Sequence, residues 1–117
     1  MLPICAAKPV EQKNQLRMSK FIVSVKRSEH GSLVVVTDIE IIGRKFEEGK
    51  LQLDLTKDFY KGDEKNIIEV EKDLLYARHV HFTGEKSVSL GIKLGLIDKN
   101  KVLLVNKIPH AQAVVEN

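Results

Sequence analysis

Cysteine is almost absent from this chain, because Cys5 is the only one in 117 residues. A single cysteine excludes an internal disulfide bond and is typical of proteins in a reducing compartment. Long apolar runs are also absent: LVVV and VLLV fall far short of the ~20 residues that cross a bilayer. The opening MLPICAA lacks the charged start and the long apolar core of a secretory signal. We therefore expect a cytoplasmic protein that does not contact a membrane.

The phosphate-binding pattern GxxxxGK[ST] is missing as well, although FTGEKSVS has a similar order of glycine, lysine and serine. Two interpretations of this stretch remain open. Thr83 could cap the helix that follows, with Glu85 in its first turn. Alternatively, the free N–H groups at the helix start, together with Lys86, could accept one phosphate.

No motif for metal binding or catalysis is complete. His79 and His81 would share one face of a strand, but neither a cysteine pair nor a His–Glu helix motif accompanies them. No nucleophile lies in an evident pair with a base. We therefore expect no metal and no cofactor. We also expect a binding protein rather than an enzyme. The enzymatic alternative is a small hydrolase or nuclease that uses His79, His81, His110 and a carboxylate such as Asp38.

Charge is unevenly distributed along the chain. Residues 1–30 carry six basic and two acidic side chains, residues 31–75 carry seven and eleven, and residues 76–117 carry six and three. The net charges of these segments are therefore +4, −4 and +3. Clustered Lys and Arg attract polyanions such as RNA through counterion release, so both ends are candidates for RNA contact. An ordinary solvated surface is the alternative.

The apolar pattern predicts one α+β domain over residues 19–117. A hairpin is expected from Phe21 to about Thr37, turning at His30 and Gly31, and KIPH is expected to be a kink before the last strand. Further strands are predicted in KLQLDL, RHVHF, KVLLVN and AQAVV, and helices in NIIEVEKDLLYA and from about Glu85 to Leu94. We expect a mainly antiparallel sheet of about five to six short strands with two helices. The residues predicted to point inward include Leu51, Leu53 and Leu55 in the strand, and Ile67, Ile68, Val70, Leu74 and Leu75 in the first helix.

Residues 1–18 differ from the rest, with two prolines, no sustained periodicity and a basic second half. They are predicted to be an extended basic N-terminal arm. The start-like MSKFIVSV at Met18 leaves open the alternative that these residues precede the true translation start.

Three stretches resemble a known family. DIEIIGRKFEEGKLQLDLTKDFYKG, FTGEKSVSLGIKLGLID and IPHAQ are similar to the small archaeal family catalogued as domain of unknown function 424, from roughly Phe21 to Val115. The family usually has Cys-Asp at the positions of Thr37 and Asp38. The resemblance implies a cytoplasmic archaeal protein without an established catalytic activity, and an RNA-binding role near the translation apparatus.

The IPHAQ stretch matches the terminal motif of that family, and it holds two candidate binding residues. Pro109 is expected to interrupt a strand, and His110 and Gln112 then point the same way if the chain is extended. Both side chains can bond bases or phosphate oxygens, or they can satisfy buried backbone groups at a turn. Phe59 and Tyr60 offer a similar choice, with one ring expected in the core and the other free to stack on a base.

These observations favour a non-enzymatic RNA-binding protein of the archaeal translation apparatus, bound to the ribosome through basic termini. Ribosomal RNA and ribosomal proteins are the expected partners, and DNA is not. A protein–protein adaptor whose acidic middle docks a basic partner is a further alternative. The predicted RNA-binding residues are Lys8, Lys13, Arg17, Lys20, Arg27, Tyr60, Arg78, Lys86, Lys107, His110 and Gln112.

Overall fold

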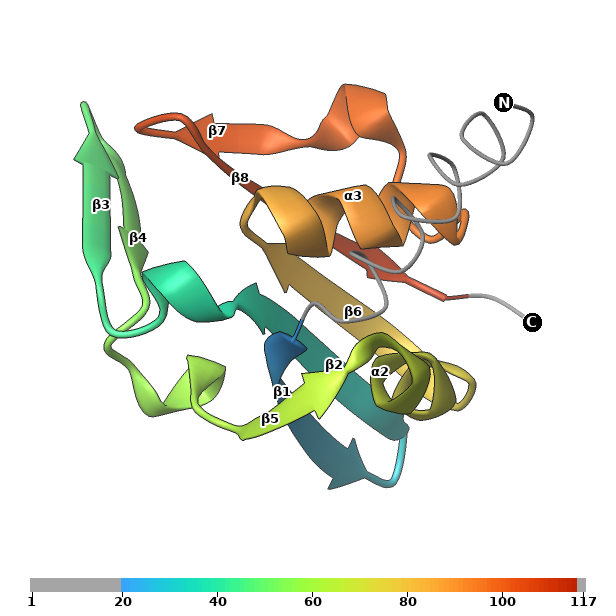
Figure 1. The fold of residues 1–117 in the computed structure, drawn as a ribbon. Coiled ribbons are helices and arrows are strands. Elements are labelled where there is room, and N and C mark those ends of the chain that lie inside the picture. Colours follow the sequence, from blue (N-terminus) through green and yellow to red (C-terminus); the bar gives the residue numbers. More distant parts are fainter. Residues whose placement is uncertain (1–19, 116–117) are drawn as a thin grey trace, which may run out of the picture.

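Figure 1 shows the fold in a computed structural model that describes residues 20–115; the predicted arm lies outside them. Six strands form one sheet in the order β5-β1-β2-β6-β8-β7, and β3 pairs with β4 in a separate hairpin. All neighbouring strands are antiparallel except β2 and β6, which are parallel. The prediction of an α+β fold with a mainly antiparallel sheet and two helices is therefore confirmed. The strands are β1 (Lys20–Ser28), β2 (Gly31–Asp38), β3 (Lys45–Glu48), β4 (Leu51–Asp54), β5 (Asp63–Asn66), β6 (Ala77–Thr83), β7 (Leu103–Val105) and β8 (Ile108–Val114).

Both α-helices, α2 (Ile67–Leu74) and α3 (Glu85–Lys93), pack on the same face of the sheet. Alternate residues of the central strands point toward them, because side chains in a strand alternate between its two faces. The resulting main core contains Phe21, Val23, Val34, Val36, Val80, Phe82 and Ala111 from the sheet, and Ile67, Val70, Leu74, Val88 and Leu90 from the helices. The helices therefore cover one face of the sheet, and a functional surface must be sought on the other.

Helix α2 begins with a capping box, in which the Asn66 side chain accepts the Glu69 N–H and the Glu69 side chain accepts the Asn66 N–H. Its buried face is narrower than predicted. Ile68 is 57% exposed and Leu75 is 69% exposed, so the prediction that both point inward is wrong. With 3.6 residues per turn, Ile67, Val70 and Leu74 form the buried stripe and their neighbours turn toward solvent.

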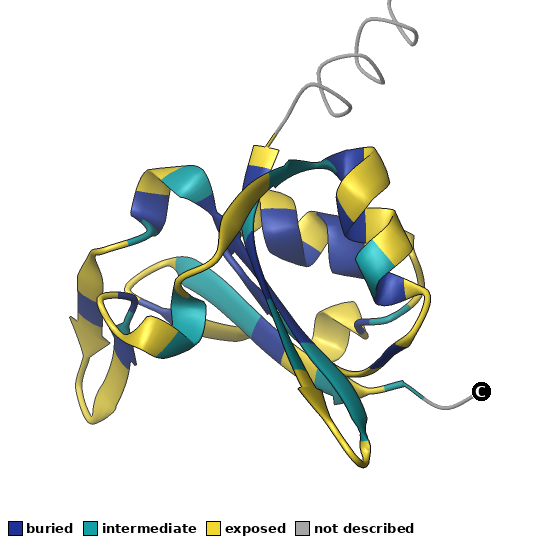
Figure 2. Cartoon of the chain, turned by 90° about the horizontal axis from the view of Figure 1, so that it is seen from below, coloured by how far each residue is buried: buried dark blue, intermediate teal, exposed yellow. Residues whose placement is uncertain are grey.

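A second, smaller core lies under the β3–β4 hairpin. It consists of Ile41, Phe46, Leu53, Leu55 and Val105, with Tyr60 and Ile108 packed against it. Figure 2 shows that the hairpin itself is mostly exposed. Leu51 is 41% exposed, contrary to its predicted inward position, because it pairs with Glu48 at the tip of the hairpin.

The predicted kink at KIPH is also wrong. The chain turns at Asn106 and Lys107, which have φ values of 49° and 69°, as in a two-residue turn with both residues left-handed. Pro109 lies inside β8, in register with Leu104. Proline lacks a backbone N–H but keeps its carbonyl, and the Pro109 carbonyl accepts a hydrogen bond from the Gly84 N–H at 2.9 Å.

Three 3-10 helices connect these elements: η1 (Ile39–Ile41), η2 (Asp58–Tyr60) and η3 (Lys99–Lys101). Element η1 directly follows β2, and Ile41 is its buried residue. Within residues 20–115, no helix has the length and apolar character to span a membrane.

Candidate functional site

The sheet face opposite the helices is only half covered. One half lies under η1, η2 and the hairpin, where Val35, Thr37 and Thr83 are buried. The other half, toward the β1–β2 turn, carries Lys26, Leu33, His79, His81, Gln112 and Val114. Residues paired across neighbouring strands point to the same side, and the pairs Lys26–Leu33, Leu33–His79 and His79–Val114 link four of the six. The pair His81–Gln112 joins them because His79 and His81 alternate along β6 and so share a face. We call this set the open face.

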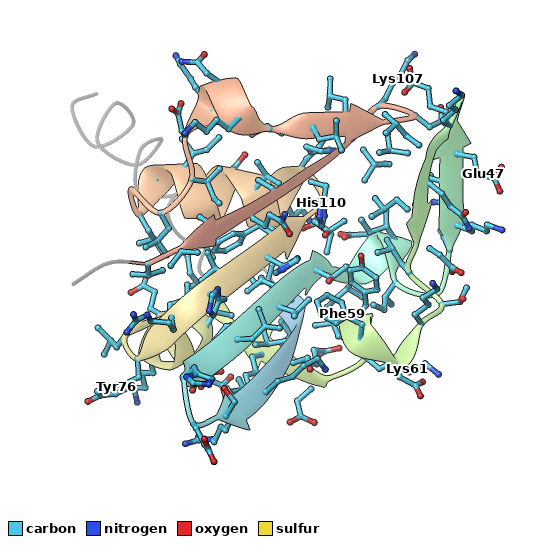
Figure 3. The ribbon with its side chains drawn as sticks, turned by 180° about the vertical axis from the view of Figure 1, so that it is seen from behind. Glu47, Phe59, Lys61, Tyr76, Lys107 and His110 are labelled. Carbon is cyan, nitrogen blue, oxygen red and sulfur yellow. The ribbon has the colours of Figure 1, made fainter. Side chains whose placement is uncertain are left out.

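Phe59, on η2, stands at the boundary between the covered half and the open face. Its ring lies edge-on to the His81 imidazole, with centroids 5.2 Å apart, and the Lys26 Nζ is 5.3 Å from its centroid. In Figure 3, Phe59 and His110 lie over the same side of the sheet. Tyr60 packs instead into the second core, and burial raises the pKa of its hydroxyl. Tyr60, which was predicted to bind RNA, therefore packs against the second core, and Phe59 is the ring beside the open face.

His110 extends the row of rings, with its imidazole centroid 5.8 Å from that of His81. Its Nδ1 lies 2.8 Å from the hydroxyl oxygen of Thr83, and this hydrogen bond fixes the orientation of the ring. Burial, and to a smaller extent His81, lower the pKa of His110 to about 4. Burial and then His79 also lower the pKa of His81. Both imidazoles are consequently neutral near pH 7. They can donate and accept hydrogen bonds, but they carry no positive charge.

The α3 N-terminus is occupied by a side chain of the protein itself. The Asp38 carboxylate accepts the backbone N–H groups of Lys86 and Ser87, at 3.0 and 2.8 Å, and the Ser87 hydroxyl at 2.7 Å. Lys86 pairs with Glu40 at 2.9 Å. The residue at the N-cap position is Gly84, without a side-chain cap, so the prediction of capping by Thr83 is wrong. The phosphate interpretation of FTGEKSVS loses its basis as well, because the carboxylate of Asp38 already fills the position of the anion.

The remaining predicted residues are scattered. Lys8, Lys13 and Arg17 lie outside the described residues. Lys20 begins β1 and pairs with Glu64 at 3.2 Å. Arg27 and Arg78 are exposed on β1 and β6, and Lys107 is exposed in the β7–β8 turn. Of the eight predicted residues that the structure describes, His110 and Gln112 are the two on β8, at the sheet face discussed here.

Three polar residues of the open face were not among the predicted RNA-binding residues: Lys26, His79 and His81. Lys26 and His79 interrupt apolar strands at positions that alternate with core residues, and this alternation was the available signal. The position of Phe59 depends on a connection between distant elements, which no local pattern reveals.

The histidines do not form the grouping that the enzymatic alternative requires. Within residues 20–115, the hydrogen bonds of the Asp38 carboxylate go to α3 and not to a histidine. The same part of the chain has no group of three His, Cys, Asp or Glu side chains arranged to hold a metal ion.

These features define a small α+β protein with helices on one face of a mixed sheet and a polar patch with several rings on the other. The chain belongs to the family described as Protein of unknown function (DUF424), whose model matches residues 25–115. This membership confirms the resemblance seen in the sequence.

A solved structure with a similar fold is that of an uncharacterized conserved protein from Methanopyrus kandleri. The TM-score is 0.62 at 16% sequence identity, and the match covers 85% of this chain and 96% of that one. At this identity the similarity concerns the fold alone. No match was found among curated proteins.

Proposed function

We propose that this protein binds RNA through the open face and serves the archaeal translation apparatus on the ribosome. The observation that carries the proposal is the row of planar side chains along a sheet face that the helices leave uncovered. Phe59, His81 and His110 follow one another at centroid separations of 5.2 and 5.8 Å. All three rings are partly exposed, and sheets with accessible rings are a common platform for unpaired RNA bases.

The charges around the open face suit an RNA backbone. Lys26 lies within the face, and Arg27 is exposed on the same strand. Lys8, Lys13 and Arg17 precede β1 in the chain. Basic groups of this kind contact phosphates and supply affinity that does not depend on sequence, whereas rings and amides contact the bases.

RNA binding is tested with a short fluorescent single-stranded RNA, by anisotropy at several salt concentrations. Lys26→Gln should weaken binding and reduce the slope of log K against log salt by about 0.7, the loss of one phosphate contact. Lys72→Gln is the matched control, because Lys72 is an exposed lysine on α2, which packs on the other side of the sheet. Equal effects of both substitutions, or no binding by the wild type, would contradict the proposal.

The link to the ribosome rests on the family resemblance and is tested in native extract. After sedimentation through a sucrose gradient, the protein should migrate with a ribosomal subunit at both low and high salt. Migration only at the top of the gradient would contradict a ribosomal role.

A protein–protein adaptor remains the second candidate, and one feature favours it. The C-terminal ends of α2 and α3 flank an apolar hollow of about 220 Å³, lined by Glu71, Leu74, Leu75, Leu94 and Leu96. Exposed apolar patches of this kind often mark protein contacts. Pull-downs that survive RNase treatment, together with the loss of partners in Leu75→Ser, would favour this function over RNA binding.

A further inference from the structure

The open face contains a hollow that the RNA-binding proposal does not by itself explain. Its volume is about 340 Å³, and His79, His81, Gln112, Ala113 and Val114 line it. This volume lies at the lower end of the range of small-molecule sites. The hollow is thus large enough for one planar group and too small for a folded partner.

The polar side chains that line the hollow have no hydrogen-bond partner among the described residues. Within residues 20–115, no side-chain hydrogen bond joins His79, His81 or Gln112 to another residue, in contrast to His110, which bonds Thr83. The Nδ1 atom of His81 is buried and unpaired. Among these three side chains, only His81 has a buried atom without a partner, and buried polar atoms are normally paired, so the Nδ1 of His81 marks a place where a ligand can supply a bond.

The chemistry of the lining favours an uncharged ligand. A neutral imidazole offers one donor and one acceptor, and the Gln112 amide offers both kinds. Burial keeps the His81 imidazole neutral by lowering its pKa, so a phosphate or carboxylate gains no ion pair from it. Ala113 and Val114 add apolar surface. Planarity, mixed donors and acceptors, and the absence of charge are the properties of a nucleobase edge.

The surroundings provide the contacts that a nucleotide needs beyond its base. The phenyl ring of Phe59 flanks His81 and offers a surface against which a base can stack. The Lys26 ammonium lies beside Phe59 and bonds the Ser24 hydroxyl at 3.0 Å, which holds it at the edge of the open face. This cation is the candidate contact for a phosphate of an RNA whose base occupies the hollow.

We propose that the hollow is a base-recognition subsite, which takes one unpaired nucleobase of RNA between Gln112, His79 and His81. This inference rests on the proposed function, since it names the part of the RNA that the open face reads. It predicts that affinity depends on the base and not only on the backbone.

The test compares two fluorescent eight-nucleotide RNAs, one complete and one with abasic sites at its four central positions. Base stacking contributes about 1–3 kcal/mol per base, so the complete RNA should bind at least tenfold more tightly. Gln112→Ala, at an exposed position, should weaken binding of the complete RNA about fivefold and leave the abasic RNA unchanged. Tyr76→Ala is the control, because this ring is 83% exposed, directly precedes β6 and does not line the hollow.

The outcomes separate this inference from the proposed function. If both RNAs bind equally, or if Gln112→Ala weakens them equally, the base subsite is refuted while RNA binding stands. If neither RNA binds, the proposed function fails and the subsite fails with it. A second variant, His79→Ala at an exposed position of β6, repeats the comparison independently of Gln112.

Discussion

Asp38 and Ser87 are 49 residues apart in sequence, yet two hydrogen bonds join them, one from the Ser87 N–H and one from its hydroxyl. Together with the Lys86 N–H, they tie the end of β2 to the start of α3. The contact is close: a Cβ atom on Gly84 would lie 2.3 Å from the Asp38 carboxyl carbon. The role of this carboxylate is therefore structural, because it caps a helix that covers the main core.

Removal of this cap should destabilise the fold. Asp38→Ala leaves two backbone donors and the buried Ser87 hydroxyl without their acceptor, so the free energy of unfolding should fall by about 1–3 kcal/mol. Urea denaturation at pH 7 measures the change. Glu40→Ala is the control, because this carboxylate bonds Lys86 from an exposed position and its loss should cost less than about 1 kcal/mol. Equal losses in the two variants would show that Asp38 is not the cap.

Stability should also decrease in mild acid because of His110. Its pKa is about 4 in the fold, against an ordinary value of 6.5, so the unfolded chain binds a proton more readily than the folded one. The contribution of the neutral His110 to the free energy of unfolding is complete above pH 6.5 and is lost as the pH falls through 4. The largest loss is on the order of 3 kcal/mol.

Urea denaturation between pH 7.5 and 4 measures this pH dependence. His110→Gln, which keeps a polar side chain but does not titrate, should flatten the curve. A ring NMR titration of His110 with a midpoint near 6.5 would contradict the assignment.

Much of the fold could be predicted from the sequence, because local alternation determines which residues of a strand face the core. Phe21 and Val23 on β1, and Val34 and Val36 on β2, follow this pattern, and so does the hairpin between them. Strand order could not be predicted, since the parallel pairing of β2 with β6 joins segments more than 40 residues apart. For the same reason, the sequence did not reveal that Asp38 caps α3, and Thr83 was predicted as the cap instead.

The candidate site was predictable only in part. His110 and Gln112 were expected to share a face, and the extended β8 gives them one. Their neighbours on that face depend on cross-strand pairing, as for His81 opposite Gln112. Pro109 was misleading, because a proline was taken as the end of a strand while the turn is made by Asn106 and Lys107.

The basic N-terminal residues should contribute phosphate contacts. Replacement of Lys8, Lys13 and Arg17 by glutamine should reduce the slope of log K against log salt by about 2, which corresponds to three contacts on a single strand. Anisotropy titrations from low to high salt measure the slope. The control replaces Lys50, Lys72 and Lys93, three exposed lysines away from the open face. An unchanged slope in the N-terminal variant would show that these residues do not contact the RNA phosphates.

The most direct test of the account is to map the RNA contact on the protein by NMR. A single-stranded RNA of eight nucleotides is titrated into ¹⁵N-labelled protein, and shifts of the backbone amides are followed. The account predicts that the shifts concentrate on β6, β8 and the residues around Phe59, with Gln112 and His81 among the largest. Shifts confined to α2 and α3, or no shifts at all, would contradict RNA binding by the open face.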